Sequence, residues 1–496
     1  MPEGVTNNPA PALVEYAPFR HRDFTAPRDA LIHPWFAGHG YVSLRVELRG
    51  SGDSGGLPQD EYVSQEQDDA VEALEWIAAQ DWCDGSTGMF GMSWGAFSAL
   101  QVASREPPSL KAIIPVHGTD DRFADDIHYK GGCLMGAGLS WGTLYTLYTM
   151  RPPDPELSGE AWKERWLERF DQCQLLLPEW MSHQSRDDYW RHGSISEDYT
   201  QLSCPVLVIC GWADGYTNAA LRMAEHLSES SRVIIGPWAH SYPHLARPGP
   251  QVGFLQEAVK WWDRWLKGVD NGIERLPRVR LWLQDAVPPA SSYNERDGEW
   301  LAFDQWPSPV VYPSNWFLQP SRLEDSRNEE SVVGIKSPLA NAINGPEWLP
   351  HGVGPELPVD QRVEDEGSLC FDTAVLETEM VICGAPVLKL RLRTDIPAGI
   401  VCVRLVDLFE DDRATQISYG LLNLVHRNGL DHPEPLTPGK WIDVEVQLND
   451  ISQRVPIGHR LRASVSTQAW PLVWPASRTM TLELLLGKSI LTLPLL

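Results

Sequence analysis

The chain has 496 residues, of which 67 are acidic and 41 basic, and its formal charge is −26. This field repels nucleic-acid phosphates and anionic lipid, so the composition argues against both as partners. Hydrophobic residues make up 43% and charged residues 22%, which is ordinary for a globular protein. Neither a secretory signal at residues 1–11 nor a run of about 20 apolar residues is present. We therefore expect a cytoplasmic protein without a membrane partner.

The eight cysteines form no C-x-x-C pair, and none has a histidine at zinc-finger spacing. Several lie in apolar runs, such as residues 206–210, which is typical of buried reduced thiols. The glycines of residues 50–56 lack the lysine of a phosphate-binding loop. We expect neither a metal nor a cofactor.

The chain begins with alternating strand and helix patterns. Strands are predicted at residues 13–16, 41–48, 87–91 and 112–116, and helices at residues 66–80 and 94–103. This β-α-β-α order is typical of a parallel sheet covered by helices. It predicts an α/β core that begins with residues 1–119.

Residues 120–203 interrupt that order, because aromatic and charged residues recur there at helical spacing without a strand. We interpret this segment as a helical cap inserted over the sheet. Strands and helices then alternate again at residues 205–210, 218–227, 232–235 and 256–267. The second part of the core is therefore assigned to residues 204–272.

The remaining residues, 273–496, are predicted to form an all-β domain. Strands are expected at residues 280–283, 387–393, 400–409, 441–448 and 461–467, without intervening helices. Leu388, Leu390 and Leu392 alternate with basic residues, which predicts an antiparallel sandwich with one dry and one wet face. Residues 305–365, rich in Pro, Gly, Ser and Asn, are expected to form a long irregular connection.

Residues 91–95 read Gly-Met-Ser-Trp-Gly, a G-x-S-x-G pattern. The glycines permit the sharp strand-to-helix turn that exposes a nucleophilic serine, here Ser93. The pattern alone is weak, but a predicted strand precedes it and a helix of small residues follows, as this turn requires. The alternative is a tight turn with an incidental serine.

A serine hydroxyl needs a base, and the base needs a carboxylate that orients it. Candidates follow the next two predicted strands: Asp214 in the block GWADG and His240 in the block GPWAHS. Asp214 could instead cap a helix, and His244 is a rival base. The pattern predicts a serine hydrolase that uses Ser93, Asp214 and His240.

These blocks resemble the cocaine-esterase and X-Pro dipeptidyl-peptidase family. The resemblance rests on residues 85–95 (GSTGMFGMSWG), 211–215 and 236–241, together with residues 15–23 (EYAPFRHRD) and 49–56 (RGSGDSGG). It implies an α/β-hydrolase core, a helical cap and a C-terminal jelly roll of galactose-binding-like shape. It also implies that nucleophile, acid and base fall on Ser93, Asp214 and His240.

The same resemblance implies an oxyanion hole made by the backbone N–H of Trp94 and a tyrosine hydroxyl. At the position of that tyrosine this chain has Phe19, which lacks the hydroxyl. Loss of one oxyanion donor costs about 10²–10³ in turnover. The alternative function is therefore a catalytically weak or silent member that acts in binding. Tyr16 is close in sequence but lies in a predicted strand.

Family members usually have extra strands before the EYxPY-like block, and here only a short polar lead precedes it. The first strands of the core are therefore expected to be missing, which would leave an open sheet edge. We expect a longer version of the chain, extended upstream, to be more soluble.

The expected substrate is a small ester, an amide or a short peptide, and an acyl ester is favoured over an X-Pro peptide. Asp125 and Asp126 are candidates for binding a substrate ammonium group, although acidic residues at a solvated helix start are equally ordinary. Trp212 and Trp238, inside the catalytic blocks, are candidates for aromatic walls of the site, or else for core packing. A homo-oligomer is compatible with the sequence.

Overall fold

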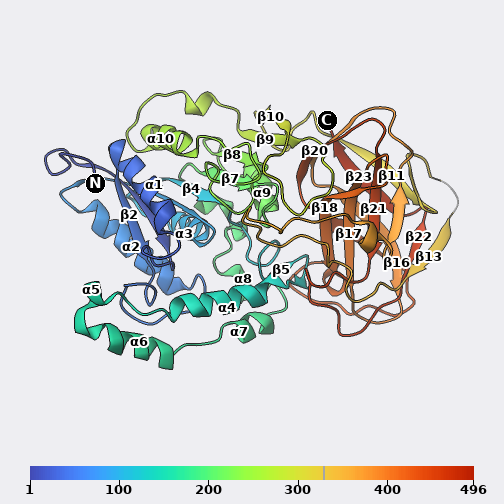
Figure 1. Cartoon of the computed structure of the whole chain (residues 1–496), viewed down its shortest axis with the longest axis horizontal. Coiled ribbons are helices and arrows are strands. Elements are labelled where there is room, and N and C mark those ends of the chain that lie inside the picture. Colours follow the sequence, from blue (N-terminus) through green and yellow to red (C-terminus); the bar gives the residue numbers. More distant parts are fainter. Residues whose placement is uncertain (328–329) are drawn as a thin grey trace.

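The computed structural model describes residues 1–327 and 330–496. The first half of the chain forms a sheet flanked by helices, and the C-terminal half forms an all-β region beside it (Figure 1). None of the helices in the described ranges is long and apolar enough to cross a bilayer.

The sheet of the first half is parallel, with the strand order β2-β1-β3-β4-β7-β8-β9. Its strands are β1 (Ala10–Ala17), β2 (Val42–Glu47), β3 (Cys83–Met92), β4 (Leu110–Val116), β7 (Leu207–Gly211), β8 (Arg232–Gly236) and β9 (Val279–Gln284). β1 is buried at every position, because parallel strands in the middle of a sheet are covered on both faces. Within the described ranges β2 pairs only with β1, so β2 is the edge.

Helices cover both faces of this sheet. They are α1 (Ala26–Gly38), α2 (Ser64–Ala78), α3 (Trp94–Ala103), α9 (Thr217–His226) and α10 (Phe254–Trp265). α1 and α10 bury Phe36 and Trp262 in one cluster, whereas α2, α3 and α9 bury Leu74, Leu100 and Leu221 in another. The sequence patterns predicted all of these helices except α1, whose hydrophobic face is poorly marked and whose interior contains a proline.

Between β4 and β7 the chain forms short helices instead of strands of the sheet. They are α4 (Ala137–Thr149), α5 (Pro155–Ser158), α6 (Trp162–Asp171), α7 (Leu177–Ser182) and α8 (Asp188–Arg191). A small hairpin of β5 (Tyr129–Lys130) and β6 (Cys133–Leu134) precedes them. Figure 1 shows α4, α6 and α7 along one side of the core, with α4 extending towards the all-β region. Short 3-10 helices lie at Gly159–Ala161, Ile195–Glu197, Tyr199–Gln201, Ile273–Arg275 and Leu424–His426.

The all-β region follows β10 (Gly298–Phe303), an antiparallel neighbour of β9. Its strands are β11 (Tyr312–Gln319), β12 (Arg322–Glu324), β13 (Ser331–Ile335), β14 (Leu369–Asp372), β15 (Met380–Gly384), β16 (Val387–Thr394), β17 (Ile400–Leu408), β18 (Ala414–Asn423), β19 (Ile442–Gln447), β20 (Ile451–Val455), β21 (Arg460–Ser466), β22 (Leu482–Leu486) and β23 (Ile490–Leu495), with a short helix α11 (Arg362–Asp365). Among the described residues, one pair of strand neighbours, Gln284 of β9 and Gln453 of β20, joins this region to the parallel sheet.

The alternation read from the sequence is confirmed in β16 and β19, which pair in antiparallel register. Leu390 and Val444 face each other in the core, whereas Lys389 and Glu445 form an exposed ion pair at 3.3 Å. The stretch expected to be irregular, residues 305–365, differs from that expectation because it contains β11, β12 and β13. These are peripheral strands, and proline, serine and asparagine in β11 hide its alternation.

Candidate active site

Ser93 occupies the turn between β3 and α3 in a strained backbone conformation, with φ 58° and ψ −120°. A glycine is required at position 91, because a Cβ there would lie 2.6 Å from the Cα of Gly95. The N–H of Ser93 donates to the carbonyl oxygen of Val116 in β4, at 3.0 Å. The strand, the tight turn and the helix thus fix the direction of the serine side chain.

Asp214 and His240 lie in the loops that follow β7 and β8, two adjacent parallel strands. His240 Nδ1 and Asp214 Oδ2 are 2.5 Å apart, and the N–H of Tyr216 donates to Asp214 Oδ1 at 2.8 Å. Burial would raise the pKa of Asp214, but the imidazoles of His240 and His117 hold it well below its usual range. This contact orients the imidazole of His240, whose Nε2 has no hydrogen-bond partner among the described residues.

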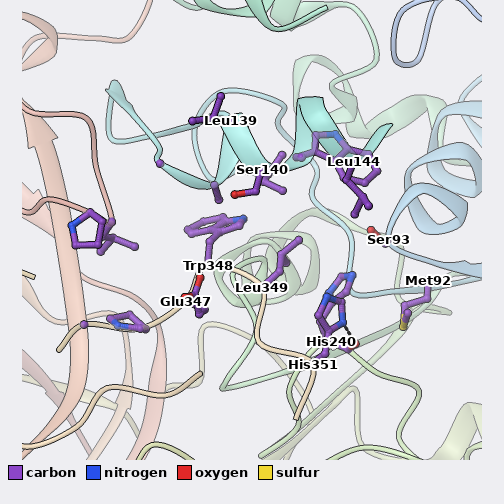
Figure 2. Close-up of a pocket in the computed structure, with 18 of the residues that line it drawn as sticks. Met92, Ser93, Leu139, Ser140, Leu144, His240, Glu347, Trp348, Leu349 and His351 are labelled. Carbon is purple, nitrogen blue, oxygen red and sulfur yellow. Dashed lines mark hydrogen bonds between the residues drawn. The ribbon is translucent and has the colours of Figure 1, made fainter. Parts of the chain in front are cut away.

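Ser93 and His240 face the same pocket, which has a volume of about 700 Å³. Figure 2 shows Ser93 above His240, with His351 beside the imidazole and Trp348 and Leu349 along the wall. No hydrogen bond joins Ser93 Oγ to His240 within the part of the chain that the structure describes. Such contacts commonly tighten only when substrate binds.

Apolar and aromatic side chains form most of the pocket wall, and they come from the core, the helices after β4, the connection and the all-β region. They are Phe19, Phe24, Ile127, Leu139, Trp141, Leu144, Tyr148, Ile343, Trp348, Leu349, Trp470 and Trp474. An apolar pocket with a few polar groups at its base is the usual form of a small-molecule site.

The rival base His244 lies outside this pocket. Neither of its ring nitrogens has a hydrogen-bond partner, and its ring stacks on Phe254. Burial lowers the pKa of His244 to about 4. Asp214 therefore orients His240 and not His244.

Comparison with known proteins identifies the family of the chain. Residues 1–242 match the model of the X-Pro dipeptidyl-peptidase (S15) family, and residues 271–493 match that of the X-Pro dipeptidyl-peptidase C-terminal non-catalytic domain. The chain belongs to this family of serine hydrolases.

Two curated members illustrate the range of the family. Cocaine esterase of Rhodococcus sp. (strain MB1 Bresler) is 26% identical over 88% of this chain and 82% of its own length. A Xaa-Pro dipeptidyl-peptidase of Lacticaseibacillus rhamnosus is 22% identical over 87% of this chain and 59% of its own length. The crystal structure of a CocE/NonD family hydrolase from Staphylococcus aureus has the same fold, with a TM-score of 0.75 and 18% identity over 98% of this chain and 89% of that one.

Phe19, at which the resemblance implies the oxyanion tyrosine, lines the pocket and packs edge-on against Phe24 and Tyr148. Tyr16 does not replace the missing hydroxyl, because its own hydroxyl donates to the backbone carbonyl of Glu66 at 3.2 Å. The backbone N–H of Trp94 begins α3 beside Ser93 and donates to no group among the described residues. It remains available as an oxyanion donor.

Asp125 and Asp126, the two residues predicted as candidates for binding a substrate ammonium group, have different surroundings. Asp125 is paired with Lys130 and Arg222 and lies outside the pocket. Asp126 lines a cavity of about 20 Å³ that adjoins Ser93, together with Glu61. Burial raises the pKa of Asp126 to about 6.

Trp212 and Trp238, the two candidates for aromatic walls of the site, pack behind it. Trp238 is fully buried and its indole N–H donates to the carbonyl oxygen of Pro250, whereas that of Trp212 donates to the carbonyl oxygen of Trp282. Neither lines the pocket that holds Ser93. Gly211 leaves room for this packing, since a Cβ there would lie 2.0 Å from the carbonyl oxygen of Trp238.

Two parts of the site carried no signal in the sequence. His117, directly after β4, lies 3.2 Å from Asp214 through its Nδ1. The connection supplies Trp348, Leu349 and His351 to the pocket, and the carbonyl oxygen of Pro350 accepts the N–H of His240. Only the position of His117 at the end of an apolar strand could have drawn attention to it.

The imidazole and carboxylate atoms of His117, Asp214 and His240 are close enough together to offer ligands to a metal ion. However, His240 Nδ1 is engaged with Asp214, and His117 Nε2 with the carbonyl oxygen of Ser241. These contacts engage one ring nitrogen of each histidine with a protein oxygen.

Proposed function

We propose that Ser93, His240 and Asp214 are a catalytic triad, and that the protein hydrolyses small esters through an acyl-enzyme on Ser93. The observation that carries the proposal is the 2.5 Å contact of His240 Nδ1 with Asp214 Oδ2, in a pocket that also holds Ser93. The strained turn at Ser93 supports it, because backbone strain of this kind persists where function requires it.

In the proposed reaction, Ser93 Oγ attacks the acyl carbon while its proton passes to His240 Nε2. Asp214 holds the Nδ1–H of His240 and stabilises the imidazolium that forms. The tetrahedral intermediate then collapses, the acyl–oxygen bond breaks, and His240 gives its proton to the leaving alkoxide. A water molecule, deprotonated by His240, attacks the acyl-enzyme, and the acid product leaves with Ser93 restored.

The negative oxygen of both intermediates would be stabilised by the N–H of Trp94. Phe19 supplies no second donor, so we expect turnover lower by about 10²–10³ than with a complete oxyanion hole. This substitution is also the observation that favours the second candidate function, a weak or silent hydrolase that acts by binding.

The pocket wall favours an ester with an apolar or aromatic acyl group over an X-Pro dipeptide. Trp348, Trp470 and Trp474 provide aromatic surface, which binds apolar groups without fixing their hydrogen bonds. Two acidic residues could attract a cationic substituent: Glu347 lines the main pocket, and Asp126 lies in the small cavity beside Ser93. That cavity is large enough for about one water molecule, so only a small group would enter it.

Labelling with a fluorophosphonate, which reacts with activated serines, tests the proposal. We expect labelling of the wild-type protein and none of the Ser93→Ala variant. Hydrolysis of p-nitrophenyl esters should exceed that of Ala-Pro-p-nitroanilide. An unlabelled wild-type protein would instead support the binding function, and a preference for the anilide would reverse the proposed substrate class.

A further inference from the structure

A second imidazole shares the carboxylate of Asp214. His117 is completely buried, and its Nε2 lies 2.9 Å from the carbonyl oxygen of Ser241. Its Nδ1 lies 3.2 Å from Asp214 Oδ2, the same oxygen that contacts His240 Nδ1. The carboxylate therefore lies between two imidazoles whose ring centres are 5.4 Å apart.

The neighbours of His117 indicate which of its nitrogens carry hydrogen. The carbonyl oxygen of Ser241 can only accept, so Nε2 carries a hydrogen. An ionised Asp214 can also only accept, so a neutral His117 would turn the lone pair of Nδ1 towards a negative oxygen. The imidazolium form has a hydrogen on both nitrogens, which replaces this repulsion by an ion pair.

The backbone of His117 is fixed by the neighbouring strand. Its N–H donates to the carbonyl oxygen of Ile209 in β7 at 2.8 Å, and its φ is +53°. The preceding residue, Val116, accepts the N–H of Ser93. The backbone of His117 thus belongs to the short segment that also fixes the serine turn.

Charged and titratable groups reach this pair of imidazoles from several elements. Asp214 and Tyr216 come from the loop after β7, His351 comes from the connection, and Asp126 interacts with Tyr216. Burial lowers the pKa of His240, Asp214 raises it, and His117 and His351 lower it again. A positive charge on His117 therefore opposes protonation of His240.

We propose that His117 is a positioning residue which, as an imidazolium, holds Asp214 and keeps His240 unprotonated in weakly acidic solution. The inference rests on the proposed triad. A triad with a lone histidine would lose its base as that histidine becomes protonated near pH 6.5, the ordinary value, whereas this site would retain it to lower pH.

The rate of fluorophosphonate labelling as a function of pH tests the role of His117. In the wild-type protein the midpoint of the acid limb should lie below about 6.5. Two neutral variants each retain one donor of the ring: His117→Asn can reach Asp214, and His117→Gln can reach the carbonyl oxygen of Ser241. In both, the acid limb should move up by about one to two pH units, because a unit charge near His240 is removed.

Other results would overturn the inference. If His117 had only a structural role, its substitution would reduce the labelling rate by the same factor at every pH and would leave the midpoint of the acid limb unchanged. If the variants do not fold, a wild-type midpoint at or above about 6.5 is sufficient to reject the proposed role. Labelling that occurs in the wild type and is absent in Ser93→Ala, with no movement of the limb, would reject the role of His117 and leave the triad intact.

Discussion

The backbone N–H of His240 donates to the carbonyl oxygen of Pro350 at 2.7 Å. The proposed base is therefore supported by a segment more than a hundred residues further along the chain, in the connection to the all-β region. That segment is itself held by Glu356, whose carboxylate accepts the N–H groups of His351, Gly352, Val353 and Gly354 at 2.9–3.0 Å. Glu356 thus organises the loop that contacts His240.

We predict that Glu356→Gln loosens this loop and lowers kcat by about ten-fold, because small displacements of a catalytic group are costly.

Burial would raise the pKa of Glu356, but its four backbone donors lower it. A lowered pKa stabilises the fold above the unfolded value of about 4.3, and this contribution is lost as the pH falls through the folded value. The difference in Tm between wild type and variant should therefore stay constant from neutrality to about pH 5 and shrink only as the pH falls through about 4.3 and below.

Glu366→Gln serves as the matched control, since Glu366 is exposed and lies outside the loop. We expect this variant to keep wild-type kcat and Tm. An equal loss of activity in both variants, or a difference in Tm that does not change with pH, would contradict the role given to Glu356.

We predict that Asp214→Asn lowers the turnover of an ester substrate by about 10⁴-fold, because an amide cannot hold the required tautomer of His240. His244→Gln should leave turnover within about three-fold, because His244 lies outside the pocket and the substitution does not change the reacting groups. The measurement is kcat for a p-nitrophenyl ester. Comparable losses in the two variants would mean that the base has been assigned to the wrong histidine.

Phe19→Tyr is expected to raise kcat by about ten-fold or more, since a hydroxyl at this position would restore the second oxyanion donor. KM should change little, because the donor acts on charge that develops in the transition state. Phe24→Tyr is the control, as Phe24 lines the same pocket and packs against the same ring. A gain in both variants would point to a general effect of polarity rather than to an oxyanion donor.

Trp348→Leu is predicted to discriminate between substrates. Trp348 lines the pocket and is 3% exposed, and leucine keeps an apolar side chain while removing the aromatic surface. We expect kcat/KM for a benzoyl ester to fall about ten-fold, and that for an acetyl ester to change less than about three-fold. Trp76→Ala, at an exposed position 60% accessible to solvent, should alter neither value. A uniform loss across both esters would indicate damage to the fold.

The sequence was most informative where local chemistry is dictated by neighbours along the chain. Gly91 precedes the serine turn because a Cβ there would clash with the backbone of Gly95, so this part of the pattern reports the geometry. Asp214 and His240 were found because loops at the carboxyl ends of adjacent parallel strands meet. Alternating leucines likewise revealed β16, because one of its faces is buried and the other is not.

Long-range contacts were beyond such reasoning. His117 meets Asp214 only because β4 and β7 are neighbours in the sheet, which no local pattern reveals. The contribution of the connection to the pocket depends on a loop folding back over His240, and its proline-rich composition predicted only irregular backbone. The place of Phe24 in the pocket wall was not predicted, because Phe24 precedes α1, a helix with a weak hydrophobic pattern.

The pocket wall is assembled from sections of chain that lie on both sides of the junction between β9 and β20. Chimeras that exchange the C-terminal half between relatives would consequently transplant Trp470 and Trp474 along with the scaffold, while Ser93, Asp214 and His240 stay in place. The same exchange would replace Pro350, whose carbonyl oxygen accepts the N–H of His240, so the donor of the C-terminal half is expected to set both the acyl preference and the turnover of the hybrid.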